Sequence, residues 1–325
     1  MTASAETEFA RFVATLGRGP GRSRPLTRDE ARTAFGMVLA GQADPHQVGA
    51  FLMLLRFRGE DADEIAGMVE AGRDALGLEG AGLSADLDWP SYGAGRTRGA
   101  PWFLLAALAL AQAGVRVLMH GSNDFSAGMT VAQGLAALGL APAAGVPGAA
   151  LGLRDTGFAY LPLAGMAPAF DTLLGLRRLF GLRSPVNTVV RLLNPADAPA
   201  GVDSVFHPPY IDVHRGVAER LGRRRLLVLK GGGGEAERVP LKPASAHLWD
   251  QARGRSDLVL SAVAGLPPLS PRDDTPDLFA AVWSGMAAPP TVIATIEATI
   301  ELGLLAMGRS ETVARTIWDA RQRLP

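Results

Sequence analysis

Residues 102–128, WFLLAALALAQAGVRVLMHGSNDFSAG, contain the pattern that decides the fold. An apolar helical stretch over 102–114 leads into a strand over 115–121, and the strand ends in a polar loop. Further strand character occurs at 157–163, 186–195, 204–210, 224–231 and 256–265. Because helical stretches lie between several of these segments, the sequence predicts an α/β fold with a mostly parallel central sheet flanked by helices.

The segment that precedes this pattern is helical throughout. TRDE at 27–30 is a capping box, and Asp44 followed by Pro45 marks a second helix start. A third helix over 61–76 carries its acidic residues at the N-terminal end, where the helix dipole favours them. Residues 26–77 therefore predict three short helices in a small N-terminal unit.

Composition excludes several kinds of site. The chain has 325 residues and no cysteine, so disulfides, thiolate nucleophiles and zinc–thiolate sites are ruled out. The N-terminus lacks the features of a signal peptide, and no apolar run reaches the roughly 18 residues needed to span a bilayer. The histidines are scattered without metal-ligand spacing. We expect a cytoplasmic protein with no membrane contact and no protein-held metal.

The net charge of zero hides a segregation of charges. Arginines crowd residues 11–32, acidic residues crowd 60–88, and 214–230 is basic again. Such runs are either solvated helix faces or basic surfaces for a polyanionic partner.

Three strand-to-loop junctions carry candidate chemistry, because ligands of open α/β sheets lie beyond the carboxyl ends of the strands. At the first, the strand over 115–121 delivers His120, Gly121, Ser122 and Asn123 into a loop before a helix. These hydroxyl and amide groups, with helix amides, suit phosphate oxygens. The alternative is a plain capped turn.

The second junction is LVLKGGGGEAERVPLKP at 227–243. Lys230 supplies a positive charge at a strand end, and Gly231, Gly232 and Gly233 let backbone amides approach a ligand. The spacing is not that of a P-loop, and no helix follows as in a dinucleotide-binding fingerprint. A flexible glycine turn is the alternative.

The third junction is DWPSYGAGRTRGAPWF at 88–103, where Trp89, Tyr92 and Trp102 alternate with Arg96 and Arg98. Aromatic rings interleaved with arginines suit stacking on bases while guanidinium groups neutralise phosphates. The alternative places the two tryptophans in the core.

These junctions, taken in order, resemble the anthranilate phosphoribosyltransferase family, which has the family 3 glycosyltransferase fold. The similarity also includes residues 26–68, 119–126 and 176–195. It implies a helical, dimerising domain over residues 1–82, an α/β phosphoribosyltransferase-like domain over 83–325, and an active cleft between them.

Departures from the family pattern imply a degraded donor site. The family's GTGGD loop is replaced by the segment that contains Tyr92, and its KHGNR becomes MHGSN at 119–123. Of the Asp-Glu pair that holds magnesium in the family, Gly234 takes the aspartate position and Glu235 remains, while Arg177 matches the arginine that contacts the aromatic acid. The lost charge-assisted contacts are worth roughly 1.5–3 kcal/mol each, so efficient transfer to anthranilate is not expected.

The segments WPSY and LKGGGGEAE resemble a divergent branch of the family, the YbiB-like proteins, which are regarded as nucleic-acid binders. This resemblance implies a homodimer that binds single-stranded nucleic acid without sequence preference and with strong salt dependence. Arg223 to Arg225 are further contacts that it implies. The predicted phosphate- or nucleic-acid-binding residues are Lys230, Gly231, Gly232, Gly233, His120, Gly121, Ser122, Asn123, Arg96, Arg98, Tyr92, Arg177, Arg22 and Arg24.

Two other hypotheses remain at this point. The chain is an active phosphoribosyl- or glycosyltransferase with a substrate other than anthranilate, or it is a scaffold dimer without a ligand. No catalytic residue is assigned. No cofactor is expected, and Mg²⁺ enters only with the transferase hypothesis.

Overall fold

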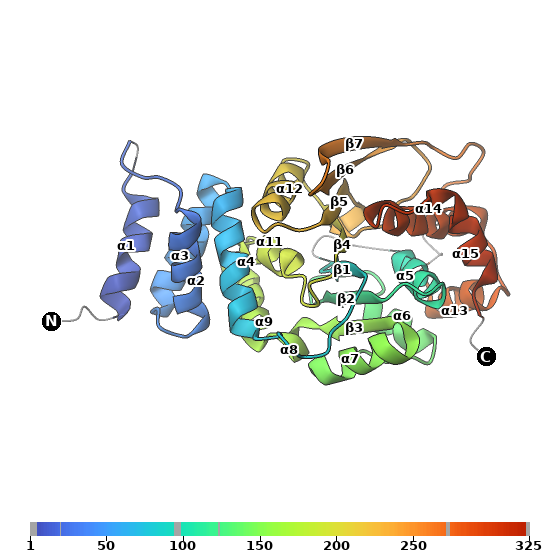
Figure 1. Ribbon diagram of the computed structural model, residues 1–325, viewed down its shortest axis with the longest axis horizontal. Coiled ribbons are helices and arrows are strands. Elements are labelled where there is room, and N and C mark those ends of the chain that lie inside the picture. The colour runs from blue at the N-terminus through green and yellow to red at the C-terminus, as the bar shows by residue number, and fades with distance from the viewer. Residues whose placement is uncertain (1–4, 20, 94–98, 123, 271–273, 323–325) are drawn as a thin grey trace.

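The computed structural model describes residues 5–19, 21–93, 99–122, 124–270 and 274–322. A group of N-terminal helices lies beside a larger α/β unit built on one sheet (Figure 1). These helices are α1 (Ala5–Gly17), α2 (Arg28–Leu39), α3 (Pro45–Arg58) and α4 (Ala62–Leu76). The arrangement confirms the predicted fold class. The predicted division into domains 1–82 and 83–325 falls in the connection between α4 and β1 (Leu87–Ser91) and stays a prediction.

Side-chain caps start three of the N-terminal helices where the sequence predicts them. The Thr27 hydroxyl accepts from the backbone of Glu30, and Glu30 in turn accepts from the backbone of Thr27. Asp44 and Asp61 make the same reciprocal caps for α3 and α4. The crossing of α2 and α4 is close, because a Cβ at Gly67 would lie 2.1 Å from the carbonyl oxygen of Arg28. Glycine is therefore required at this crossing.

One seven-stranded sheet forms the centre of the α/β unit, in the order β3-β2-β1-β4-β5-β6-β7. The first five strands of the chain are parallel, and the last two pair antiparallel. The other strands are β2 (Val117–Gly121), β3 (Phe158–Pro162), β4 (Ala200–Val205), β5 (Arg225–Lys230), β6 (Ala244–Asp250) and β7 (Gly254–Leu260).

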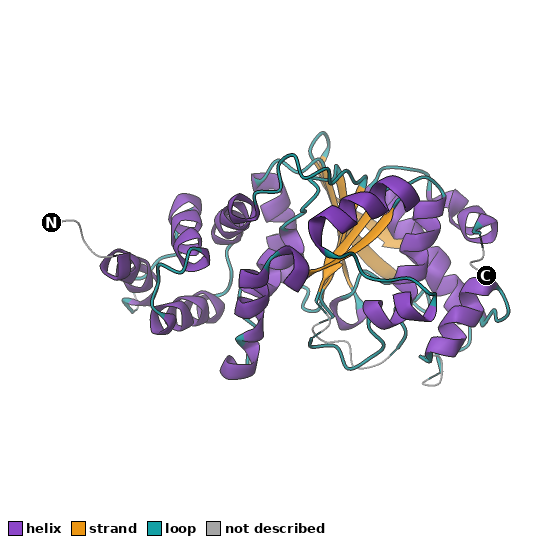
Figure 2. Cartoon of the chain, turned by 90° about the horizontal axis from the view of Figure 1, so that it is seen from below, coloured by secondary structure: helices purple, strands orange, loops and turns teal. Residues whose placement is uncertain are grey.

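Helices cover both faces of this sheet (Figure 2). The remaining helices are α5 (Trp102–Gln112), α6 (Val131–Ala137), α7 (Gly145–Thr156), α8 (Leu163–Met166), α9 (Pro168–Gly175), α10 (Arg177–Phe180), α11 (Val186–Leu192), α12 (Tyr210–Arg220), α13 (Pro276–Ser284), α14 (Pro290–Ala306) and α15 (Ala314–Ala320), with short 3₁₀ turns η1 (Gly232–Gly234) and η2 (Glu311–Val313). On one face α5 and α14 pack on the central strands, and on the other α7, α11 and α12 do so.

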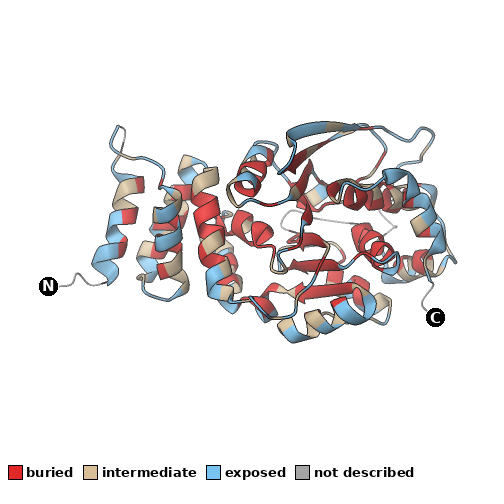
Figure 3. Cartoon of the chain, viewed as in Figure 1, coloured by how far each residue is buried: buried red, intermediate tan, exposed pale blue. Residues whose placement is uncertain are grey.

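Alternating side chains separate two cores across the sheet. Val117 and Met119 of β2 belong to the core under α5 and α14, whereas Leu118 between them belongs to the opposite core. In β5, Leu227 and Val228 divide in the same way. Figure 3 shows that the central strands and their adjoining helices are buried, whereas the edge strand β7 is mostly exposed.

The core of the N-terminal helices also draws on residues far along the chain. Phe170 of α9 packs edge-on against Phe35 of α2, with ring centroids 5.6 Å apart. A Cβ at Gly72 of α4 would lie 2.6 Å from the Phe170 ring. Residues 163–193 thus pack between α4 and the sheet (Figure 1).

Not every predicted strand is a strand. Residues 186–195, predicted as a strand, form α11 followed by a turn, because a short apolar run does not distinguish the two states. The backbone NH of Ser184 donates to Asn187 at the start of this helix. Of 204–210, Ser204 and Val205 alone lie in a strand, and β6 is absent from the predicted set.

The described residues contain no helix long and apolar enough to cross a membrane.

Candidate functional site

The carboxyl ends of β1 and β4 meet at the point where the strand order reverses. From β1 the chain proceeds through β2 to β3 on one side, and from β4 to β5 on the other. Crevices at such reversals are the usual ligand sites of open α/β sheets. A pocket of about 60 Å³ lies here, lined by residues at the ends of β1 and β4, by α3, α11 and the start of α12, and by the four-glycine segment 231–234 after β5, which we call the glycine loop.

Three arginines line this pocket, and we call it the arginine pocket. Arg56 comes from α3, Arg183 from the turn before α11, and Arg191 from α11 itself. The remaining lining residues are Glu60, Tyr92, Ser184, Asn187, Thr188, Ser204, Val205, Phe206, His207, Tyr210, His214, Gly233 and Gly234.

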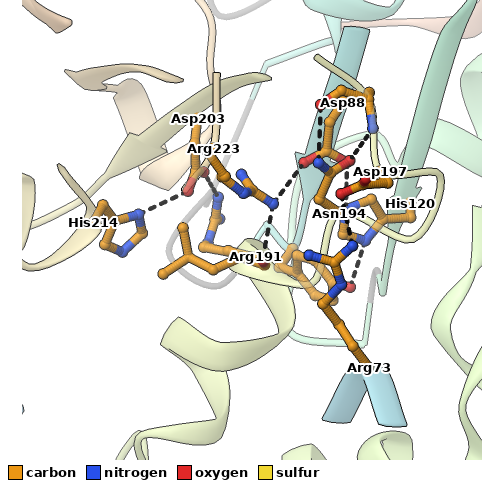
Figure 4. Close-up of polar contacts among 12 residues, drawn as sticks. Arg73, Asp88, His120, Arg191, Asn194, Asp197, Asp203, His214 and Arg223 are labelled. Carbon is orange, nitrogen blue, oxygen red and sulfur yellow. Dashed lines mark hydrogen bonds and ion pairs between the residues drawn. The ribbon is translucent and has the colours of Figure 1, made fainter. Parts of the chain in front are cut away.

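Arg191 is held from behind by a buried carboxylate. Its Nη1 lies 2.9 Å from Asp203 Oδ1, and its Nη2 donates to the carbonyl oxygen of Gly234 at 2.6 Å. Asp203 is fully buried and its other oxygen lies 2.7 Å from His214 Nδ1 (Figure 4). Burial alone would raise the pKa of Asp203, but His214 and Arg191 outweigh burial and lower it. The carboxylate is therefore ionised, and it fixes the guanidinium of Arg191.

Arg183 lies in a strongly cationic environment. Its guanidinium lies 5.6 Å from the Phe206 ring, which is 43% exposed at the pocket mouth. Burial, followed by repulsion from Arg177, Arg191 and Arg56, lowers the pKa of Arg183 to about 10.

Among the described residues that line the pocket, the one carboxylate is already engaged within it. Glu60 accepts from the Thr188 hydroxyl at 2.6 Å and from the Tyr210 hydroxyl at 3.1 Å, and lies 3.5 Å from Arg56. Arg56 also donates to the Tyr210 hydroxyl. Glu60 thus lies beside Arg56, and Asp203 pairs with Arg191.

One residue that lines the same pocket carries a buried hydroxyl. Ser204, at the end of β4, is 1% exposed and lines the pocket. Within the described chain its hydroxyl has no hydrogen-bond partner. A buried polar group without a partner is costly.

The glycine loop folds against the sheet instead of standing open. A Cβ at Gly231 would lie 1.9 Å from the carbonyl oxygen of Glu235, so glycine is required there. Gly233 has a φ of 65°, which also favours glycine. The Glu235 carboxylate accepts from the backbone NH of Gly93 and is 2% exposed. Gly233 and Gly234 line the pocket, while Gly231 and Gly232 do not.

Lys230 marks the end of β5 and is exposed. No ion pair or hydrogen bond joins its ammonium group to the described residues. It is placed as predicted, at a strand end beside the glycine loop.

The expected contacts of the first junction are only partly possible. His120 is fully buried, with Nε2 3.1 Å from Asp88 and Nδ1 2.9 Å from the Tyr92 hydroxyl, so it cannot contact a phosphate directly. Asp88 also lies 3.5 Å from Arg223 (Figure 4). A Cβ at Gly121 would lie 1.6 Å from the carbonyl oxygen of Ser91, so this glycine serves strand packing. Ser122 is half-buried, outside the pocket lining.

At the third junction the structure agrees with the alternative that places the two tryptophans in the core. Trp89 and Trp102 are buried in the core, 0% and 2% exposed, and Tyr92 is 2% exposed. Burial raises the pKa of Tyr92, which lines the arginine pocket with its hydroxyl bound to His120. The exposed ring beside an arginine is instead Phe206.

Several predicted arginines have structural partners. Arg24 pairs with Glu30 at 2.6 Å, and Arg22 is exposed in the same loop, which joins α1 and α2 in the N-terminal group of helices (Figure 1). Arg223 is buried and donates to the carbonyl oxygen of Leu192, and Arg225 pairs with Asp250. Arg96, Arg98 and Asn123 lie outside the described residues.

Arg177 lies near the pocket without lining it. Its guanidinium lies 4.7 Å from the Phe125 ring, and the neighbouring Arg178 pairs with Asp124 at 3.3 Å. These contacts tie the loop after β2 to α10. Arg177 acts on the pocket through its charge, which contributes to the lowered pKa of Arg183.

The residues present do not fit a magnesium ion held by a carboxylate pair in the glycine loop. Glu235 is buried and its carboxylate is bound to the Gly93 backbone. The described residues contain no group of three or more acidic, histidine or cysteine side chains placed to hold a metal.

The sequence reasoning missed Arg183, Arg191, Asp203 and Ser204. They come from separate segments that only the fold brings together. A signal did exist, since Arg191 and Asp203 are charges within apolar runs, and such charges are rarely buried without a partner.

Two family models match the chain. The model described as "Glycosyl transferase family, helical bundle domain" matches residues 11–76, and "Glycosyl transferase family, a/b domain" matches residues 103–262.

Curated relatives and solved structures agree with these matches. Anthranilate phosphoribosyltransferase of Moorella thermoacetica is 30% identical over 303 residues, which cover 90% of this chain and 88% of the relative. That of Geobacillus kaustophilus is 27% identical, covering 93% and 90%. The crystal structure of the Thermus thermophilus enzyme has a TM-score of 0.75 at 24% identity, covering 99% and 94%. The Saccharomyces cerevisiae enzyme in complex with PRPP and Mg has a TM-score of 0.73 at 16% identity, covering 98% and 94%.

Proposed function

The chain belongs to the glycosyl transferase family that includes the anthranilate phosphoribosyltransferases, and on that premise we propose that it is a divergent member that binds single-stranded nucleic acid at the arginine pocket. The observation that carries this proposal is the convergence of Arg56, Arg183 and Arg191 at the β1/β4 reversal. Arginine side chains that line one pocket favour phosphate.

Groups at the mouth of the pocket suit a polynucleotide. Phe206 and His207 are exposed and pack edge-on, with ring centroids 4.8 Å apart, beside Arg183. An exposed ring next to a guanidinium allows a base to stack while the phosphate is neutralised. Lys230 adds an exposed cation on the neighbouring strand. In this proposal phosphate contacts dominate, so binding is salt-dependent and insensitive to sequence.

Binding in this proposal does not use magnesium. The inward-turned Glu235 supports a degraded donor site, since its carboxylate is bound to the Gly93 backbone. Protein-held magnesium generally needs one or two available carboxylates in addition to phosphate oxygens.

A homodimer through the N-terminal helices is part of the proposal. Helix α3 buries Phe51 and Leu52, yet Met53 and Leu54 are only partly covered and Phe57 is 90% exposed. A helix with apolar residues on more than one side is usually covered on more than one side. The mass in solution, measured by analytical ultracentrifugation, should be that of a dimer, and Phe57→Glu should shift it toward the monomer.

Fluorescence anisotropy with a labelled single-stranded oligonucleotide tests the proposal. We expect binding at about 50 mM salt that weakens by at least tenfold at about 200 mM, with or without Mg²⁺. Arg183→Gln should weaken binding by about tenfold, the effect of one lost charge-assisted contact. Arg154→Gln is the matched control, because Arg154 is exposed on α7 and pairs with Asp155. Absence of binding at low salt would refute the proposal.

Phosphoribosyl transfer is the second candidate, favoured by the 30% identity to an anthranilate phosphoribosyltransferase across 90% of the chain. Here the arginine pocket would hold the phosphate of a sugar-phosphate donor, and fixed positive charge would stabilise charge that develops in the transition state. Turnover of a phosphoribosyl donor with a panel of nitrogenous acceptors, with and without Mg²⁺, is the test. Lack of both turnover and donor binding would exclude this candidate.

A further inference from the structure

We infer that the arginine pocket selects RNA over DNA, because His214 presents an acceptor nitrogen to the hydroxyl that ribose has and deoxyribose lacks. This inference rests on the proposed function and names the class of nucleic acid that the pocket takes. The chemistry that it recognises is a ribose hydroxyl beside a phosphate.

His214 of α12 is held by the same buried carboxylate as Arg191. Asp203 Oδ2 lies 2.7 Å from His214 Nδ1, and Asp203 Oδ1 lies 2.9 Å from Arg191 Nη1 (Figure 4). An ionised carboxylate only accepts hydrogen bonds, so Nδ1 carries a proton and donates it. Because Arg191 already balances the charge of Asp203, we assign the neutral imidazole, whose Nε2 is then an acceptor.

The second ring nitrogen of His214 is accessible to a ligand. The residue is 2% exposed and lines the pocket. No hydrogen bond or ion pair joins its Nε2 to the rest of the described chain. Nε2 of the fully buried His120 is sealed from solvent, whereas Nε2 of His214 is not. The pocket therefore offers an acceptor whose direction is fixed by Asp203.

Donors for a neighbouring phosphate lie on α11. A guanidinium has five N–H groups, and the hydrogen bonds of Arg191 within the described chain, to Asp203 and to the carbonyl oxygen of Gly234, use two of them. Asn187 accepts from the backbone NH of Ser184 through Oδ1 at 3.2 Å, which leaves its amide nitrogen as a donor. Both Arg191 and Asn187 line the pocket. The pocket thus combines donors for phosphate oxygens with an acceptor for a hydroxyl.

This combination distinguishes the two kinds of strand. In RNA the 2′-hydroxyl lies beside the 3′-phosphate of the same nucleotide, so it can donate to His214 Nε2 while the phosphate accepts from Arg191. DNA has no hydroxyl at this position, and its binding would cover Nε2 without giving it a partner. RNA is therefore the better ligand.

The test compares three labelled single strands of one sequence without thymine or uracil, by anisotropy at about 50 mM salt. One strand is RNA, one is DNA, and one is RNA with fluorine in place of each 2′-hydroxyl, which keeps the sugar shape of RNA without a hydrogen to donate. We expect RNA to bind about fivefold more tightly than the other two, the effect of one hydrogen bond between neutral groups.

Two outcomes would overturn this inference and leave the proposed function standing. One is an affinity for DNA that equals or exceeds that for RNA, and the other is equal binding of RNA and the fluorinated strand. Absence of binding by all three strands would overturn both the inference and the proposed function.

His214→Asn assigns the effect to one side chain, because the asparagine amide can still donate to Asp203 but has no counterpart of Nε2. The ratio of RNA to DNA affinity should fall from about five to about one. His247→Asn is the matched control and should keep the ratio, since His247 Nδ1 lies 2.8 Å from Asp257 on the outer strands and outside the pocket lining. An unchanged ratio in His214→Asn would overturn the role of His214, and the fluorinated strand tests the acceptor in the unaltered protein.

A small sugar phosphate carries the same groups, so ribose 5-phosphate is added as a competitor. Displacement of the RNA only at concentrations far above the Kd of the RNA would support recognition of a strand. Displacement at concentrations near that Kd would overturn the assignment to RNA in favour of a small sugar phosphate.

Discussion

Two regions of this molecule are both rich in arginine, but the charged groups that surround their arginines differ. In the region 18–32, Arg24 pairs with Glu30, Arg28 with Glu70 and Arg32 with Asp74. In the arginine pocket, burial and then repulsion from neighbouring arginines lower the pKa of Arg183 to about 10. A basic run in the sequence thus forms a balanced surface, while arginines from distant segments form the cationic site. Spatial neighbours decide the potential, and sequence neighbours do not.

The largest expected effect concerns the buried carboxylate behind the pocket. Asp203→Ala leaves Arg191 and His214 without their shared partner in the interior. Breaking a buried ion pair in this way costs about 3–5 kcal/mol, so urea denaturation should show a loss of that size in the free energy of unfolding. A loss below about 1 kcal/mol would mean that solvent reaches Arg191 and that the pocket is not a desolvated site.

Substitutions of Arg183 and Arg28 are expected to change the free energy of unfolding in opposite directions. The pKa of Arg183 is lowered in the folded state by burial and neighbouring arginines, so its positive charge opposes folding at pH 7. Arg183→Gln should therefore raise the free energy of unfolding, by up to about 1 kcal/mol, while it weakens binding. Arg28 has a raised pKa from its bond to Glu70, and Arg28→Gln should lower stability by about 1 kcal/mol. Thermal unfolding of both variants decides the matter, and a loss of stability in Arg183→Gln would contradict the comparison.

The pH dependence of the helix cap gives a third test. Bonding to Arg24, with a smaller part from Thr27, lowers the pKa of Glu30 from 4.5 to about 2 in the folded state despite burial. Stability from this group is present above pH 4.5 and is lost as the pH falls toward 2. Glu30→Gln should reduce the free energy of unfolding by about 1 kcal/mol at pH 7. The difference between variant and wild type should shrink steadily below pH 4.5, and a constant difference would show that Arg24 does not pair with Glu30.

The smallest effect is expected at an exposed pair of the balanced region. Arg32 and Asp74 lie 2.6 Å apart with side chains 49% and 57% exposed. Arg32→Gln should change the free energy of unfolding by less than about 0.5 kcal/mol, as is usual for such pairs. The measurement is again urea denaturation, at low and moderate salt. A change above about 1 kcal/mol would show that this exposed pair contributes to stability as a buried ion pair does.

Local signals account for the parts of the fold that the sequence predicts well. The caps at Thr27 and Asp44 depend on residues within four positions of each other, and the structure contains both. The prediction of a strand at 186–195 is wrong because it also uses only local signals. The structure has helix α11 there, which packs against α4, α9 and β1. Tertiary packing overrides a weak propensity.

In the candidate site, too, some residues are predictable from local sequence and others depend on the fold. The glycine loop and Tyr92 are predicted near a ligand, and the structure places Gly233, Gly234 and Tyr92 at the pocket. The burial of His120 and Trp89 does not follow from sequence, because it depends on which face of a strand each residue occupies. Arg183 and Ser204 join the site through the strand order of the sheet, a property that no short motif carries.

The packing of the Phe170 ring on Gly72 has a consequence for folding during synthesis. The N-terminal helices leave the ribosome first, yet their core includes Phe170, Leu173 and Val186. These helices therefore remain incompletely covered until about a hundred further residues have been made, since a domain gains its stability when its contacts are complete. A nascent chain stalled before residue 163 should expose apolar surface of α4 to chaperones, and one stalled after residue 193 should not.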